Sequence, residues 1–207
     1  DALAPTPHAP MRAPRAAARP PVPLPDLPAT YAGLRAAGDA EACLAVALYH
    51  EARGESLRGR RAVASVILER AATPGRWGAT VCEVISPRQF TFYTGPDCLS
   101  GGRCAIPPVA EAEAWDHAVR LARAMRRTGP LPALRGADHY HAATIHPYWA
   151  DTLTRVGAID GHIFYADPRA ARLRLAAVSA RNPDMRAGPR PHPRPVPVRP
   201  APRPAGR

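Results

Sequence analysis

The chain carries 27 prolines, and most of them lie at its two ends. Nine fall within residues 1–38 and ten within residues 166–207, where they alternate with other residues as in PRPHPRPVPVRP. Proline interrupts helices and sheet ladders, and these segments contain few side chains able to bury surface. We therefore expect 1–38 and 167–207 to be disordered with polyproline II character. The segment 39–166 is expected to fold as one domain.

The net charge of +11 is distributed just as unevenly. Residues 39–165 hold 14 arginines and 13 acidic residues, a net charge of +1, whereas residues 166–207 hold ten arginines and two aspartates, a net charge of +8. A nucleic-acid-binding domain would itself be basic, so we expect no specific nucleic-acid partner. The basic tail is either a solvated terminus or an anchor to an anionic surface of the cell envelope.

Other features of composition exclude whole classes of protein. All 28 basic residues other than histidine are arginine, and the absence of lysine rules out a P-loop, an S-x-x-K nucleophile and a Schiff-base lysine. No run of 18 apolar residues is present, so we expect no membrane-spanning segment. The chain begins at Asp1 rather than Met, and we expect a processed N-terminus.

Helix and strand signals in the middle segment predict an α+β domain that is mainly helical. Asp39 and Ser56 are good N-caps, and Gly54 could end the first helix in a left-handed conformation. The expected helices cover 40–53, 57–72 and 108–127. Short strands are expected over 138–143, 152–157 and 162–166, the last two joined at an Asp160-Gly161 turn. These strands predict a small antiparallel sheet.

Four cysteines favour one or two disulfides in an exported protein. Cys98 and Cys104 bracket a Gly-rich loop that could close as a disulfide. Cys43 falls within a helical pattern, so we expect it to be a small buried apolar residue. Cys82 has no assigned partner. The C-x₂-C spacing that zinc prefers is missing.

Glu51 is the most informative residue. At helical spacing it shares a face with Leu44, Ala47 and Leu48. Burial among apolar groups and the negative end of the helix dipole both raise the pKa of a carboxyl group there, and a protonated carboxyl group is what general-acid catalysis needs. The alternative is an ion pair with an arginine at position 53, 58 or 61. Glu55 either orients the next helix or supplies a second carboxylate.

The histidines allow a metal site as an alternative. His50-Glu51 begins like H-E-x-x-H, but Gly54 stands where the second histidine ligand should be. His139 and His141 share one face of a strand and could form a His₃ zinc site with His146 or His162. We expect these histidines to line a cleft instead, with no metal and no cofactor.

Four segments of the sequence match, in order, the motifs of a known family. They are ALYHEARGESLRGRRAVASVILER, TVCEVISPRQFTF, ADHYHAATIHPYWA and IDGHIFY. Together they resemble the cell-wall hydrolases of the spore-cortex-lytic (SleB/CwlJ) type over residues 40–166. The resemblance implies a lysozyme-like fold that acts on peptidoglycan. It also implies that Glu51, the first Glu of E-A-R-G-E, does the proton work.

The sequence departs from the family pattern at three places. Glu69 stands where the family usually has Asn, which could alter activity. Thr91 replaces a common Ser but keeps the hydroxyl group. An insertion around Cys98–Cys104 lengthens the loop after QFTF and could reshape the groove.

We therefore expect cleavage of the β-1,4 bond between N-acetylmuramic acid and N-acetylglucosamine, as by a lytic transglycosylase with a single catalytic glutamate. The alternatives are a zinc-dependent amidase or peptidase, a catalytically inactive peptidoglycan-binding module, and a nucleic-acid binder. We expect a periplasmic, envelope or secreted monomer that binds glycan strands. Aromatic and polar side chains suited to sugars predict the binding groove: Gln89, Phe90, Thr91, His139, Tyr140, His141, Trp149, His162 and Tyr165.

Overall fold

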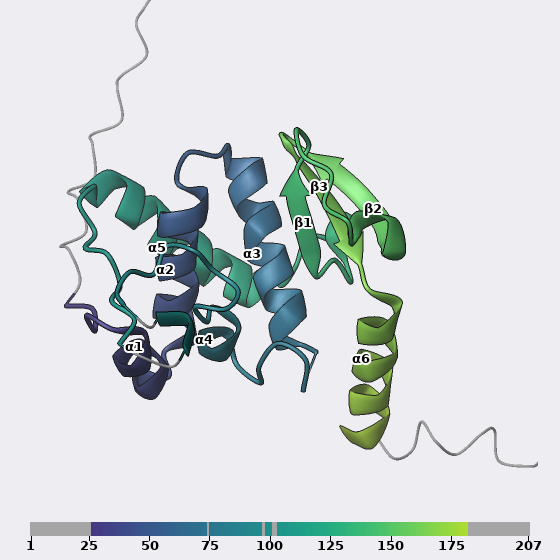
Figure 1. Cartoon of the computed structure of the whole chain (residues 1–207), viewed down its shortest axis with the longest axis horizontal. Coiled ribbons are helices and arrows are strands. Elements are labelled where there is room, and N and C mark those ends of the chain that lie inside the picture. Colours follow the sequence, from purple (N-terminus) through teal and green to yellow (C-terminus); the bar gives the residue numbers. More distant parts are fainter. Residues whose placement is uncertain (1–25, 74, 97, 101–102, 182–207) are drawn as a thin grey trace, which may run out of the picture.

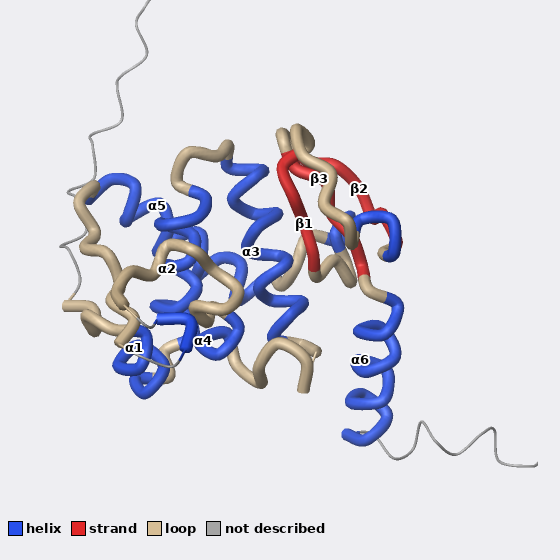
Figure 2. The backbone as a smooth tube through the Cα atoms, in the orientation of Figure 1, coloured by secondary structure: helices blue, strands red, loops and turns tan. Residues whose placement is uncertain are grey.

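The computed structural model describes residues 26–73, 75–96, 98–100 and 103–181. Figure 1 shows a body of helices with a small sheet beside α3, and Figure 2 separates the helices from the three strands by colour. The predicted mainly helical α+β class is confirmed. The helices are α1 (Tyr31–Ala37), α2 (Ala40–Ala52), α3 (Leu57–Ala71), α4 (Val81–Val84), α5 (Ala112–Thr128) and α6 (Pro168–Arg181). The strands are β1 (His139–Ala142), β2 (Thr154–Ile159) and β3 (His162–Ala166).

Side-chain caps set the starts of the two central helices, as predicted. The Asp39 carboxylate accepts hydrogen bonds from the first-turn amides of α2, and the Ser56 hydroxyl accepts one from the amide of Gly59 in α3. The expected ending of α2 is wrong, because its C-cap is Arg53 in the right-handed helical region and Gly54 has no positive φ. The third predicted helix starts later than expected, with Glu111 as the N-cap of α5.

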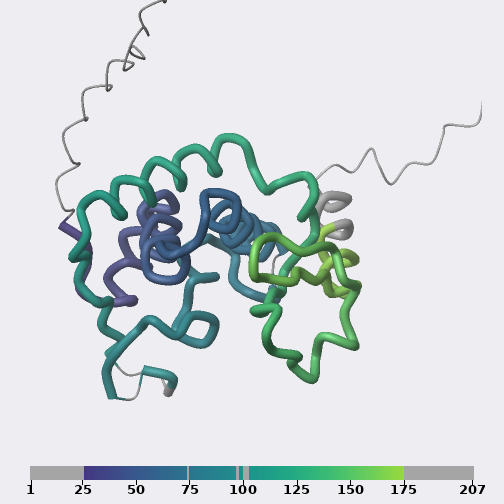
Figure 3. Tube along the Cα trace, turned by 90° about the horizontal axis from the view of Figure 1, so that it is seen from above, coloured from purple at the N-terminus to yellow at the C-terminus, as the bar shows by residue number. Residues whose placement is uncertain are grey.

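The main core surrounds α2, whose residues from Cys43 to Tyr49 are all buried. Figure 3 shows α5 running alongside α2 and α3, and the Tyr49 hydroxyl accepts backbone hydrogen bonds from Ala110 and Glu111 before α5 begins. A disulfide joins Cys43 to Cys82 and so connects α2 to α4. The expectation of an unpaired apolar Cys43 is therefore wrong. The second disulfide, Cys98–Cys104, is the one expected from the sequence.

The three strands form an antiparallel sheet in the order β1-β3-β2. Tyr140 of β1 lies opposite Phe164 of β3, and Phe164 packs in a second small core with Ala62 and Val66 of α3. This sheet face therefore turns towards the helices. The β2–β3 turn lies at Asp160, which has a φ of 51°, as the Asp-Gly pair predicts. β2 itself starts two residues later than expected because Ala150–Thr152 form a 3₁₀ turn.

Two helices lie within the end segments that were expected to be disordered. Thr30 caps α1, Gly38 ends it with a φ of 67°, and Leu34 is only 1% exposed. α6 begins at Pro168, a position that suits proline, and the Asp167 carboxylate accepts a hydrogen bond from the amide of Arg169. For these two stretches the expected disorder is wrong. The rest of the two expected segments, residues 1–25 and 182–207, lies outside the described residues.

α6 is attached to the domain through buried charged groups. The Arg174 guanidinium lies 3.6 Å from the carboxylate of Glu69 and donates hydrogen bonds to the Thr73 hydroxyl and the Gly136 carbonyl. Glu69 is 6% exposed. Glu69 therefore serves as the ionic partner of α6.

No helix in the described part of the chain combines the length and apolarity that crossing a bilayer requires.

Candidate active site

Glu51 lies in the last turn of α2, and its side chain is half-buried. Its Oε1 atom is buried and has no hydrogen-bond partner in the described part of the chain. The alternative of an ion pair with a nearby arginine receives no support within those residues. Arg53 instead pairs with Glu111 at 3.3 Å, and the guanidinium of Arg53 lies over the ring of Tyr49.

Burial raises the pKa of Glu51 above the ordinary value of 4.5, and the backbone amide of Thr91 partly offsets this effect. The cause is loss of hydration, which disfavours the charged form of a carboxyl group. The direction agrees with the argument from the helix face. A neutral carboxyl group in this position can donate a proton.

Two tyrosines lie within the electrostatic reach of Glu51. Burial and the negative charge of Glu51 raise the pKa of Tyr140 to about 12. Burial also raises the pKa of Tyr93, with Tyr31 and Glu51 adding to the effect. Both phenols stay protonated at neutral pH, and the Tyr93 hydroxyl donates to the Ile85 carbonyl at 2.5 Å. Tyr93 was not among the predicted site residues.

Glu55 lies in the turn between α2 and α3, at the rim of this site. Its Oε2 atom is 4.0 Å from Nδ1 of His162, and its side chain is close enough to Gly59 that a Cβ atom there would meet it at 3.1 Å. Beside it, the Ser56 hydroxyl donates to the carboxylate of Asp160 at 2.5 Å. These contacts attach the start of α3 to the β2–β3 turn and place Glu55 and His162 together.

The three predicted site residues at 89–91 differ in their exposure to solvent. Gln89 and Thr91 are exposed, and the amide of Thr91 acts on Glu51. Phe90 is 4% exposed and belongs to the main core. It therefore supports the loop from beneath.

The predicted residues of the sheet lie on two opposite faces, because side chains along a strand alternate in direction. Tyr140 and His162 lie on the face that packs against α3, with ring centroids 5.5 Å apart. The other four predicted residues gather on the opposite face, where their rings contact one another: His139, His141, Trp149 and Tyr165. The structure thus divides the predicted groove into a set near Glu51 and a set behind the sheet.

A buried polar network lies at the start of β1, beside α3, and was missed in the sequence. Asp138 is fully buried, and its Oδ1 atom accepts from Nδ1 of His139 at 2.8 Å and from the amide of Asp167 at 2.9 Å. Arg70 is buried, donates to the Asp138 carbonyl at 2.8 Å, and lies over the ring of Trp77. Asp138 directly precedes His139, and this adjacency was the available signal for the pair.

The described residues contain no group of three or more His, Cys, Asp or Glu side chains placed to hold a metal ion. Both ring nitrogens of His141 already have partners, because Nδ1 donates to the Ala142 carbonyl and Nε2 accepts from the Tyr165 hydroxyl. The zinc alternative therefore receives no support from this part of the chain.

Comparison with known proteins agrees with the motifs. Residues 54–165 match the family described as Cell Wall Hydrolase. The chain is similar to the catalytic domain of the Bacillus cereus SleB protein, with 31% identity over 60% of this chain and 88% of that one, at a TM-score of 0.43. No curated protein sequence matches it significantly.

The family match begins three residues after Glu51 and does not include it. The evidence for the role of Glu51 is therefore the burial and surroundings of its side chain. The match nevertheless spans more than half of the chain and contains α3, the sheet and the loop that reaches Glu51. On this evidence, the chain belongs to the cell wall hydrolase family.

Proposed function

We propose that this protein cleaves the glycan strands of peptidoglycan at the bond between N-acetylmuramic acid and N-acetylglucosamine, with Glu51 as the single acid and base. Membership of the cell wall hydrolase family supports an enzyme that acts on peptidoglycan. The observation that carries the finer assignment is the Glu51 carboxyl group itself, half-buried, without an ion pair in the described residues, and with a raised pKa.

In this mechanism Glu51 first donates its proton to the glycosidic oxygen. The bond to the anomeric carbon then breaks with its electron pair on the leaving sugar, and an oxocarbenium-like centre develops. The Glu51 carboxylate next takes the proton of the muramoyl 6-hydroxyl as that oxygen attacks the anomeric carbon. The product is a 1,6-anhydro sugar, and Glu51 is protonated again. No water is consumed.

The surroundings of Glu55 support this route over a hydrolase with a carboxylate nucleophile. A retaining hydrolase needs a second carboxylate facing the anomeric carbon. The negative charge of Glu55 contributes to the raised pKa of Tyr140. However, the carboxylate of Glu55 lies against Gly59 and beside His162. Glu55 therefore has a structural position at the rim, and we assign it no covalent role.

The substrate-binding residues closest to the reaction are proposed to be Gln89, Thr91, Tyr140 and His162. All four lie on the Glu51 side of the sheet or on the adjoining loop. Behind the sheet, His139 and Trp149 are proposed to contact more distant sugars, because His141 and Tyr165 are only 5% and 6% exposed. Activity on peptidoglycan would place the protein in the cell envelope or outside the cell.

The test is mass spectrometry of purified peptidoglycan after digestion by the full chain. We expect muropeptides that end in an anhydro sugar, lighter by one water than the corresponding reducing sugar. Muropeptides with reducing N-acetylmuramic acid would show hydrolysis and contradict the transglycosylase mechanism. Release of free peptides from uncut strands would instead identify an amidase and overturn the proposal.

A further inference from the structure

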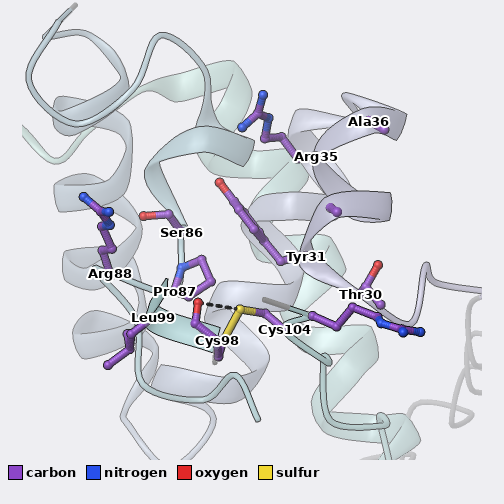
Figure 4. Close-up of a pocket in the computed structure, with 12 residues that line it drawn as sticks. Thr30, Tyr31, Arg35, Ala36, Ser86, Pro87, Arg88, Cys98, Leu99 and Cys104 are labelled. Carbon is purple, nitrogen blue, oxygen red and sulfur yellow. Dashed lines mark hydrogen bonds between the residues drawn. A yellow bond between two sulfur atoms is a disulfide. The ribbon is translucent and has the colours of Figure 1, made fainter. Parts of the chain in front are cut away.

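A cavity of about 1030 Å³ is lined in part by residues 86–88, which lead into the loop that carries Thr91. It is bounded by residues of α1, by residues 86–88 after α4 and by Cys98, Leu99, Arg103 and Cys104. Figure 4 shows Tyr31 at its centre, with Arg35 and Ser86 around the phenol and Arg88 beyond Ser86. The proposed mechanism uses none of these side chains.

The lining of this cavity is basic. Arg35, Arg88 and Arg103 all line it, and no acidic side chain among the described residues does. None of the three forms an ion pair with a carboxylate in the described part of the chain, whereas Arg53 and Arg123 are both paired with glutamates. This concentration of cations is local, because residues 31–165, which include all three arginines, carry a net charge of only +2.

The chemistry of the lining suits a carboxylate. A guanidinium group offers planar, paired donors that match the two oxygens of a carboxylate. The Ser86 hydroxyl adds a further donor, and beside it the Tyr31 hydroxyl donates to the Glu83 carbonyl at 3.5 Å. Arg35 already interacts with the Tyr31 phenol, which directs its guanidinium to the same region as the hydroxyl group.

Along the chain, a residue of the cavity lies close to a residue that contacts Glu51. Arg88 lines the cavity, and Thr91, three residues later, contacts Glu51 through its amide. Three residues span at most about 11 Å. A short peptide attached to a sugar held at Glu51 could therefore reach Arg88.

We propose that this cavity binds carboxylate groups of the stem peptides carried by the glycan strand. The proposal rests on the proposed function for the identity of the polymer. Such binding makes the enzyme selective for strands that still carry peptides. The carboxylates would be held by Arg35 and Arg88, which lie on opposite sides of the Tyr31 phenol.

The test compares two soluble substrates, glycan strands with their stem peptides and the same strands after an amidase has removed them. Binding to the full chain is measured by calorimetry for Glu51→Gln and for the same chain carrying Arg35→Gln and Arg88→Gln. We expect the added pair to weaken binding of peptide-bearing strands about tenfold, or ~1.4 kcal/mol. Binding of stripped strands should not change.

A matched control removes the same charge elsewhere, with Arg126→Gln and Arg127→Gln on the exposed end of α5. This pair should leave both affinities within about twofold of the parent chain. Equal affinity of the parent for the two substrates would overturn the proposal, and so would an equal loss on both in the Arg35 and Arg88 variant.

The design separates this inference from the proposed function. Binding does not require cleavage, so a chain that fails to cut glycan strands but still prefers peptide-bearing ones supports the cavity and contradicts only the reaction. A chain that cuts both substrates equally well, without any preference in binding, contradicts the cavity and leaves the reaction in place.

Discussion

Replacement of Glu51 by Gln is expected to lower the rate of glycan cleavage by about 10²–10⁴-fold, the range that a general acid or base contributes. Gln has the same shape and can still accept a hydrogen bond from the amide of Thr91, but it can neither donate nor accept the transferred proton. Because a partly buried neutral group replaces a carboxyl group that burial already disfavours as an anion, the fold should be retained. The measurements are initial rates on purified peptidoglycan and thermal unfolding.

The matched control is Glu55→Gln, which removes a carboxylate four residues away in the adjoining turn. It should lose less than about tenfold in rate, because Glu55 contacts His162 at the rim and is assigned no proton transfer. If Glu51→Gln kept more than a tenth of the activity, the assignment would be wrong. If Glu55→Gln were as inactive as Glu51→Gln, a mechanism with two carboxylates would replace the one proposed.

Removal of the Cys43–Cys82 disulfide, with both cysteines changed to Ala, is expected to lower the free energy of unfolding by about 4 kcal/mol. The bond joins residues 39 apart in the sequence, so its loss releases a long loop in the unfolded chain. Both sulfur atoms lie in the main core. The bond also ties α2, which carries Glu51, to α4, which precedes the loop that carries Thr91.

The Cys98–Cys104 pair provides the comparison, because it closes a separation of only six residues. Changing both of these cysteines to Ala should cost about 2 kcal/mol by the same loop-closure argument. Urea denaturation under oxidising conditions measures both losses. A loss for the Cys43–Cys82 variant no larger than that for the Cys98–Cys104 variant would contradict the buried connection between α2 and α4.

Local signals in the sequence predicted the central helices well. Asp39 and Ser56 combine a capping side chain with an apolar helical pattern, and both cap as expected. α1 and α6 were missed because proline and arginine were counted over each whole end segment. Each of these segments contains a short helical stretch beside a proline-rich one. In α6, the Ala, Leu and Arg residues after Pro168 favour a helix on their own, and the buried Glu69–Arg174 pair holds it in place.

The candidate site was predictable only in part. The helical face of Glu51 follows from spacing along one element, so a single sequence is enough to find it. The contacts of Arg70, Asp138 and Tyr93 join segments that are far apart in the chain, and no local pattern encodes them. The division of His139 and Tyr140 between two sheet faces follows from strand alternation, but which face meets Glu51 depends on tertiary packing.

The pH dependence of kcat/KM for glycan cleavage tests the central claim most directly, because it reports the acid of the free enzyme. Glu51 must be protonated to act, so the rate should fall as pH rises through its pKa. Burial raises that pKa above 4.5, and we predict that the decline has its midpoint above this value in the wild-type chain. A decline centred at or below 4.5, or a rate that keeps rising through neutral pH, would contradict Glu51 as the proton donor.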